Sequence, residues 1–121
     1  MKARRSSKPQ LLPRLRVLCG EDVALGPGKI DLLAFIADTG SIREAAERMG
    51  MSYMRAWKLV KTMNACFKEP LVETVRGGRG HGGAVLTKTG REALRCYQQM
   101  ESNCMRAVKP YWQRLQSLLN S

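Results

Sequence analysis

The stretch that decides the fold runs from residue 41 to residue 67 and reads SIREAAERMGMSYMRAWKLVKTMNACF. Ser41 and Glu44 have the spacing of a capping box at the start of a helix. The apolar positions of this helix recur as in a buried stripe: Ile42, Ala45, Ala46 and Met49. Gly50 stands where a helix ends in a left-handed residue, and Ser52 then caps a second helix. Two short capped helices around a glycine-centred turn predict a helix-turn-helix.

The second helix of this pair, from about Ser52 to Phe67, is predicted to be the recognition helix. Its periodicity assigns one face to the core, with Trp57 at the edge of that face: Tyr53, Ala56, Val60, Met63 and Phe67. The opposite face carries Arg55, Lys58, Lys61 and Thr62, and no acidic residue occurs between Ser52 and Cys66. A helix fits the major groove of B-DNA, so this basic face predicts contact with duplex DNA.

A wing is predicted directly after the recognition helix. Pro70 prevents further helix, residues 71–75 read as a strand, five glycines fall within residues 77–83, and residues 84–86 read as a second strand. Three of the glycines have the spacing of a dinucleotide fingerprint, but that motif must open a helix, whereas a strand follows here. No lysine followed by serine or threonine stands at the spacing that a Walker motif requires. The sequence therefore favours a glycine-rich wing over a nucleotide-binding loop.

The flanks of this central region complete the expected elements. Residues 11–25 resemble a short hairpin that turns at Gly20-Glu21-Asp22. Residues 26–28 break the chain, and a helix follows that ends before Gly40. Its apolar stripe at Ile30, Leu33, Ala34 and Ala37 is widened by Leu32, Phe35 and Ile36. A last helical region starts at Thr87 and continues past residue 104. Pro110 is expected to kink or restart it.

The predicted fold class is therefore mainly α with small β. The architecture is a winged helix-turn-helix with a short N-terminal hairpin, a β wing and a long C-terminal helical region. Residues 1–10 are expected to form a disordered basic tail, and residues 11–121 a single domain whose C-terminal helix serves in dimerisation. A chain of 121 residues has room for one such domain.

The charge of the chain points to its partners. It has 21 Lys and Arg against 10 Asp and Glu, a net charge of +11, and residues 1–16 contribute +6 of this. The remainder is basic on its own, which indicates a phosphate-rich polymer or an anionic membrane surface. No segment is long and apolar enough to cross a bilayer, and no apolar run follows the basic N-terminus as in a signal peptide. Duplex DNA is the expected partner, without membrane association.

Cysteine and histidine usage excludes several kinds of site. The four cysteines form no CxxC pair and the chain has a single histidine, His81, so no zinc site is expected. Free thiols and the missing export signal indicate a cytoplasmic protein. His81 has no serine, cysteine or carboxylate neighbour with which to act as a general base. The sequence therefore predicts neither an enzyme nor a bound cofactor.

The expected DNA-contacting residues come from the helix-turn-helix and the wing. They are Ser41, Arg43, Ser52, Tyr53, Met54, Arg55, Lys58, Arg76, Arg79 and His81. Arg55 can make a bidentate contact with guanine O6 and N7. Ser52 is in the first place a helix cap, with a phosphate contact as an additional role. Tyr53 and Trp57 fit the core at least as well as they fit DNA.

A set of short motifs at fixed spacing carries a resemblance to a known family. The motifs are Gly26-Pro27-Gly28-Lys29-Ile30, Gly40-Ser41-Ile42, Ala45-Ala46, Met51-Ser52-Tyr53, Ala56-Trp57, Asn64, Pro70-Leu71-Val72, Gly77-Gly78, Gly82-Gly83-Ala84 and Leu86-Thr87-x-x-Gly90. Over residues 14–107 the chain resembles the DNA-binding domain of ModE-type molybdate-responsive regulators and, more distantly, the LysR-type winged helix. The resemblance implies a bacterial transcription factor, a wing at residues 72–87, and a homodimer. Its dimer contacts would involve the stripes around Leu94, Tyr97, Met100 and Leu115.

The resemblance does not extend to the ligand. Family members that sense molybdate do so through additional C-terminal β-rich domains, whereas this sequence ends at Ser121. The expectation is a regulator that lacks the molybdate-sensing domains, with a separate partner as one possible sensor. Two alternatives stay open: a module that itself senses a small anion such as molybdate, and a protein-interaction adaptor that acts through its C-terminal helix.

Overall fold

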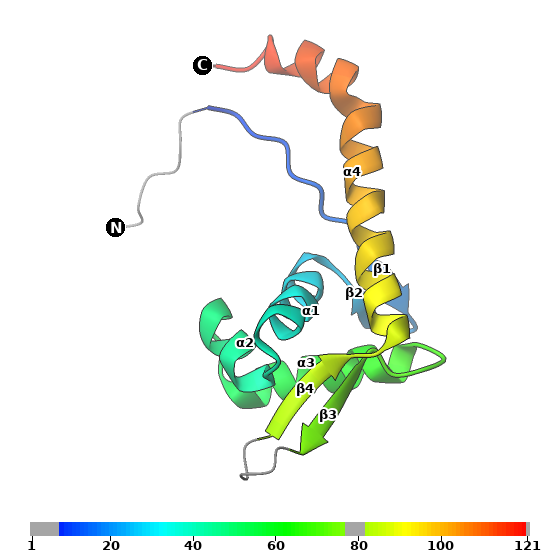
Figure 1. Cartoon of the computed structure of the whole chain (residues 1–121). Coiled ribbons are helices and arrows are strands. Elements are labelled where there is room, and N and C mark those ends of the chain that lie inside the picture. Colours follow the sequence, from blue (N-terminus) through cyan, green and yellow to red (C-terminus); the bar gives the residue numbers. More distant parts are fainter. Residues whose placement is uncertain (1–7, 77–81, 121) are drawn as a thin grey trace.

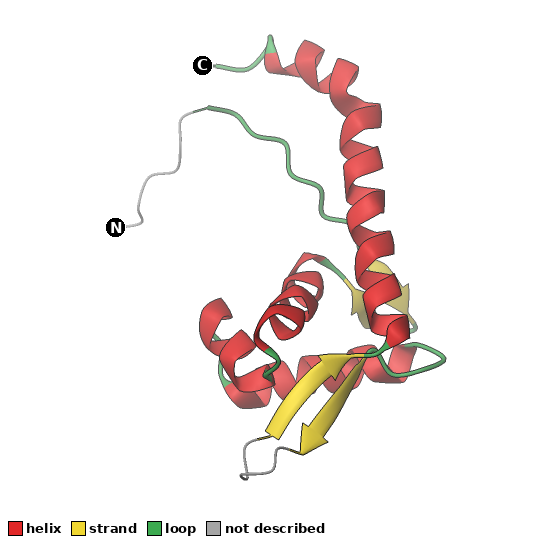
Figure 2. Cartoon of the chain, in the orientation of Figure 1, coloured by secondary structure: helices red, strands yellow, loops and turns green. Residues whose placement is uncertain are grey.

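The computed structural model describes residues 8–76 and 82–120 and has four helices and two small antiparallel hairpins within them (Figures 1 and 2). The elements in chain order are β1 (Val17–Cys19), β2 (Asp22–Leu25), α1 (Pro27–Thr39), α2 (Ile42–Met49), α3 (Tyr53–Cys66), β3 (Val72–Arg76), β4 (Gly82–Leu86) and α4 (Lys88–Gln116). The predicted winged helix-turn-helix is thereby confirmed. The predicted tail lies largely outside the described residues.

Both hairpins are short two-stranded ribbons. In the first, Cys19 pairs with Asp22 around a turn in which Gly20 has a φ of +62°. In the second, β3 and β4 pair from Val72 opposite Leu86 to Arg76 opposite Gly82. The second wing strand therefore begins at residue 82, two residues earlier than the sequence predicted, because the glycines there continue the ladder.

α1 begins earlier than its sequence suggested. Gly26 is the N-cap and Pro27 is the first helical residue, since the fixed φ of proline suits that position and its missing N–H loses no helical hydrogen bond. The break predicted at residues 26–28 is thus confined to Gly26. The helix ends at Gly40, whose φ of +70° is left-handed and whose N–H donates to the Ile36 carbonyl at 2.8 Å.

The core lies between the three short helices, the base of the wing and one residue of α4. Its most buried side chains are Leu32, Leu33, Ile36, Ala45, Ala46, Ala56, Val60, Met63, Leu71 and Tyr97. Ala37, predicted in the apolar stripe of α1, is instead exposed, because the buried side of that helix is centred on Leu32, Leu33 and Ile36. This core holds the helix-turn-helix against the wing.

α4 leaves the body of the domain after its first turns (Figure 1). Thr87 caps it by accepting a hydrogen bond from the Gly90 N–H at 2.9 Å. Beyond Tyr97 no residue of the helix is fully buried. The helix does not restart at Pro110 but runs through it, and it changes direction in the orange part of Figure 1, which includes that proline. None of the described helices has the length and apolar character of a membrane span.

Candidate nucleic-acid interface

The turn between α2 and α3 is fixed by Gly50 and by small side chains. Gly50 has a φ of +69°, and its N–H donates to the Glu47 carbonyl at 3.1 Å. Ala45, Ala46 and Ala56 are at most 1 % exposed at the helix contact, so the two helices pack closely. α3 is consequently held by its apolar face with its other face outward.

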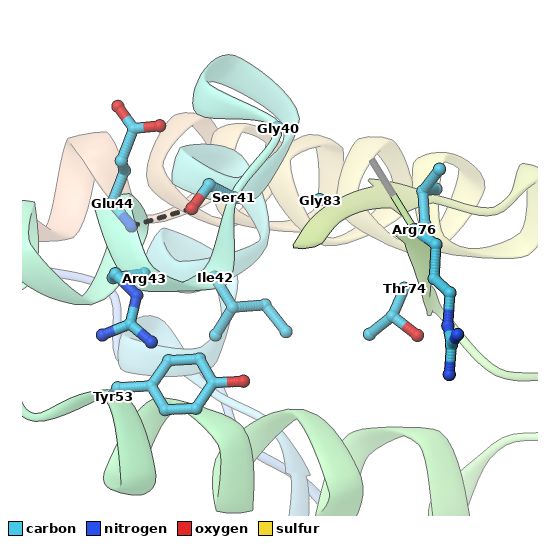
Figure 3. A pocket seen from close by; sticks show the side chains of 10 residues that line it. Gly40, Ser41, Ile42, Arg43, Glu44, Tyr53, Thr74, Arg76 and Gly83 are labelled. Carbon is cyan, nitrogen blue, oxygen red and sulfur yellow. Dashed lines mark hydrogen bonds between the residues drawn. The ribbon is translucent and has the colours of Figure 1, made fainter. Parts of the chain in front are cut away.

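Serine hydroxyls cap both helices, as the sequence predicts. Ser41 Oγ accepts from the Glu44 N–H and Ser52 Oγ from the Arg55 N–H, each at 3.1 Å. Of the two hydrogen bonds of the capping box predicted at α2, only the one from the Glu44 N–H to Ser41 Oγ is formed. Thr39, rather than the Glu44 carboxylate, accepts the hydrogen bond from the Ser41 N–H, at 3.2 Å. The Glu44 carboxylate is exposed and directed away from the Tyr53 ring (Figure 3).

The first turns of α3 are open to solvent. Ser52, Met54, Arg55 and Lys58 are exposed, with 58 % of Met54 accessible. The prediction that Tyr53 belongs to the core is wrong, because its side chain is 39 % exposed and lies before the first fully buried residue of the helix. The predicted core position Phe67 and the edge residue Trp57 are each half-buried.

Tyr53 instead makes a contact with the start of α2. The guanidinium carbon of Arg43 lies 4.6 Å from the centroid of the Tyr53 ring, within the range of a cation–π interaction. Figure 3 shows the tyrosine ring beneath the arginine, with its hydroxyl directed across a groove toward Thr74. The two residues form one wall of that groove.

The groove lies between the start of α2 and strand β3 of the wing, and its volume is about 740 Å³. Thr74 and Arg76 stand on the opposite wall (Figure 3), two residues apart and therefore on one face of the strand. Arg76 is among the DNA-contacting residues predicted from the sequence and Thr74 is not, although the period of a strand places both on one face. The site residues Arg79 and His81 lie outside the described residues.

Hydrogen bonds fix the wing to the helices at two places, one beside the groove and one at the base of the wing. The Ala84 N–H donates to the Gly40 carbonyl at 2.9 Å. Asn64, for which the sequence predicts no role beyond the resemblance, accepts from the Leu71 and Val72 N–H groups at 2.8 and 3.2 Å and donates to the Val72 carbonyl at 3.1 Å. The position of β3 and β4 is therefore set by α1 and α3, rather than by the hairpin alone.

Two capped helices at a glycine turn, an exposed basic helix face and an anchored β hairpin define a winged helix-turn-helix protein. The family model of the bacterial regulatory helix-turn-helix proteins, lysR family, matches residues 28–91, from α1 to the first turn of α4. This match covers more than half of the chain, and the chain belongs to that family.

Several regulators and molybdenum-related proteins are similar to the same region. The chain is 44 % identical to the DNA-binding transcriptional dual regulator ModE of Escherichia coli, over 59 % of this chain and 27 % of that protein. It is 37 % identical to the molybdenum transport protein ModE of Azotobacter vinelandii, over 88 % and 39 %. It is also 37 % identical to the molybdenum-pterin-binding protein MopB of Rhodobacter capsulatus, over 72 % and 32 %. The chain thus matches well under half the length of these relatives.

Proposed function

We propose that the chain binds double-stranded DNA in a sequence-specific manner and acts as a bacterial transcriptional regulator in the cytoplasm, with α3 in the major groove. The observation that carries this proposal is the exposed face of α3, which has basic residues and no acidic one over its whole length. The capped turn and the buried alanines hold that face rigidly, as base reading at fixed geometry requires.

The first turns of α3 supply the base contacts in this proposal. Arg55 presents a planar fork of donors to guanine, and the exposed Met54 side chain offers apolar contact to a thymine methyl group. Lys58 and the hydroxyls of Ser41 and Ser52 contact phosphates, which fixes the register of the domain without reading sequence. Arg79 and His81 are proposed to contact DNA from the wing.

Selection of bound sequences from a random duplex pool tests the proposal, followed by affinity measurements on selected and scrambled duplexes over a salt series. Affinity should fall steeply with salt, and the selected duplex should be preferred. Arg55→Gln should remove roughly 1–3 kcal/mol of discrimination at one base pair. The control Arg106→Gln makes the same charge change on α4 and should keep the preference. Salt-independent binding without any preference would overturn the proposal.

We further propose a homodimer that assembles through α4 and binds two half-sites. Its support is the apolar side of α4 beyond the domain body, where Met100, Tyr111 and Leu115 are 47, 70 and 51 % exposed. An apolar helix face of this length is costly in water unless a partner covers it. Two copies of α3 held by such a dimer would meet a palindromic site about one DNA turn apart, and the spacing of the selected half-sites reports this geometry.

The names of the relatives refer to molybdenum, so the sensing of an oxyanion by this chain is the alternative function against which the proposal is tested. We propose that any response to molybdate reaches this domain from a separate sensing partner or region. Calorimetric titration of the chain with molybdate checks this. The absence of saturable heat is the expected result, and stoichiometric binding would instead make the chain itself the sensor.

A further inference from the structure

The groove between α2 and the wing has two walls that a backbone hydrogen bond joins. One wall carries Arg43 over the Tyr53 ring, and the other carries Thr74 and Arg76. The hydrogen bond from the Ala84 N–H to the Gly40 carbonyl fixes the distance between the walls at one end. An occupant of this groove therefore meets a surface that is formed before binding.

The groove is also cationic, because the two arginines on its walls are not paired with acidic side chains of the described residues. Among the described residues that line it, Glu44 alone is acidic, and its carboxylate points away from the Tyr53 ring (Figure 3). Within residues 8–76 and 82–120, neither Arg43 nor Arg76 forms an ion pair, whereas Arg48 at the other end of α2 pairs with Asp38 at 2.6 Å. Two guanidinium groups on opposite sides of a groove suit an extended anion with repeated charges.

The position of the groove in the domain indicates which extended anion it holds. It opens beside the first turn of α3, because Tyr53 belongs both to that turn and to the groove wall. If α3 reads base edges, the backbone of one of the strands it reads passes next to that turn. We infer that the groove holds one sugar-phosphate strand of the bound duplex between Arg43 and Arg76, and that Tyr53 is a positioning residue for Arg43. This inference rests on the proposed DNA binding.

The role of Tyr53 follows from the stacking geometry. An arginine side chain loses considerable conformational entropy when it is held in one orientation. The guanidinium carbon of Arg43 lies over the ring of Tyr53, which restricts its position, and its N–H groups stay available to donate to a phosphodiester oxygen. The ring supplies this effect, whereas the Tyr53 hydroxyl is not needed for it.

The test compares variants of the whole chain on a selected and a scrambled duplex over a salt series. Arg43→Gln and Arg76→Gln should each weaken binding about tenfold at low salt, on both duplexes alike, and reduce the salt slope by about one. Arg106→Gln on α4 is the control for the loss of charge and should change neither quantity. If both groove variants bind as the wild type does, the groove does not hold the strand.

Tyr53 is tested by a double-mutant cycle. Tyr53→Phe keeps the ring and should bind within about twofold of the wild type, whereas Tyr53→Leu should bind roughly threefold more weakly. In an Arg43→Gln background, Tyr53→Leu should have no further effect, because there is no guanidinium left to position. An equal loss in both backgrounds would show that Tyr53 acts by itself. Thermal unfolding of each variant identifies a loss that comes from folding.

Free oxyanions share the chemistry of the phosphodiester and form a separate arm of the experiment. Titration with inorganic phosphate and with molybdate should give no saturable binding. Saturable binding that Arg43→Gln removes would make the groove a free-anion site and overturn the inference. If the wild type does not bind DNA at all, the proposed function fails. If it binds, and Arg55→Gln alone alters binding, only the inference about the groove fails.

Discussion

The phenolic hydroxyl of Tyr97 donates a hydrogen bond to the carbonyl oxygen of Leu15 at 2.6 Å, and this bond joins α4 to the segment that leads into β1. Tyr97 is 1 % exposed and is the largest fully buried side chain among the described residues. Tyr97→Phe leaves the Leu15 carbonyl without this donor and should lower the free energy of unfolding by about 1–2 kcal/mol. Urea denaturation measures the change. Tyr53→Phe, which removes the same hydroxyl at a 39 % exposed position of α3, is the control and should leave the stability unchanged.

The contact of Tyr97 with Leu15 also predicts that the free energy of unfolding decreases at alkaline pH. Burial raises the pKa of the Tyr97 phenol above its ordinary value of 10.0, so the folded state favours the neutral form. The stability contributed by Tyr97 is therefore complete below pH 10 and is lost as the pH rises beyond it. The free energies of unfolding of the wild type and of Tyr97→Phe should converge over this range. A constant difference between them up to pH 11 would contradict the assignment.

Gly90 permits the close approach of α4 to the wing. A Cβ atom at this position would overlap the carbonyl oxygen of Leu71 and lie 2.9 Å from its carbonyl carbon. Since Leu71 is fully buried and its backbone cannot move aside freely, Gly90→Ala should destabilise the domain by about 3 kcal/mol. Gly28→Ala is the matched control, because a Cβ there meets nothing within 4 Å in the first turn of α1. That change should be neutral or stabilise by up to about 1 kcal/mol.

The sequence predicted the elements that depend on local chemistry. The serine caps, the left-handed Gly50 and the apolar spacing of α2 each act within a few residues, so they can be read along the chain. The contact of Arg43 with Tyr53 joins two helices, and neither helix encodes their crossing alone. Periodicity assigned Tyr53 to the core because it cannot tell that the first turn of α3 extends beyond its packing partners.

The groove shows the same limit of prediction. Arg43 and Arg76 were each expected to contact DNA, but residues 33 positions apart in sequence reveal no common wall or width. What brings them together is the bond between the Ala84 N–H and the Gly40 carbonyl, a backbone contact that has no signature in residue type. Residue type does not distinguish Arg43 from Arg48 either, although Arg48 pairs with Asp38 and Arg43 lies over the ring of Tyr53.

Asn64 should be essential for the attachment of the wing to α3. Its side chain makes three hydrogen bonds to the backbone of Leu71 and Val72, both of which are buried. Asn64→Ala leaves these groups unpaired and should lower the free energy of unfolding by about 2–4 kcal/mol. Asn103→Ala removes an amide that is exposed on α4 and should change stability little. Equal effects of the two substitutions in urea denaturation would argue against an anchoring role.

Cys66 at the end of α3 is predicted to be a slow nucleophile. A hydrogen bond with Cys19 in β1 and burial raise the pKa of Cys66 from 9.0 to about 11. Alkylation by iodoacetamide requires the thiolate, so its rate at Cys66, followed by mass spectrometry, should increase with pH up to about pH 11. Cys19→Ala removes the hydrogen bond that is the largest cause of the raised pKa. This variant should move the rate profile to lower pH, whereas Cys104→Ala should not. A profile unaffected by Cys19→Ala would exclude the contact.

The apolar side of α4 makes the proposed dimer testable in solution. Leu115→Glu places a charge at a position that is 51 % exposed in the single chain and covered in the proposed dimer. The burial of an unpaired carboxylate is strongly unfavourable, so this variant should shift sedimentation equilibrium from dimer to monomer.

Gln113→Glu introduces the same side chain on the polar side of α4 and should leave the dimer intact. The monomeric variant should still bind a single half-site, with its affinity for the palindromic site reduced, because α3 and the groove lie within one chain. A dimer that persists in Leu115→Glu, or one that Gln113→Glu dissociates equally well, would place the interface elsewhere.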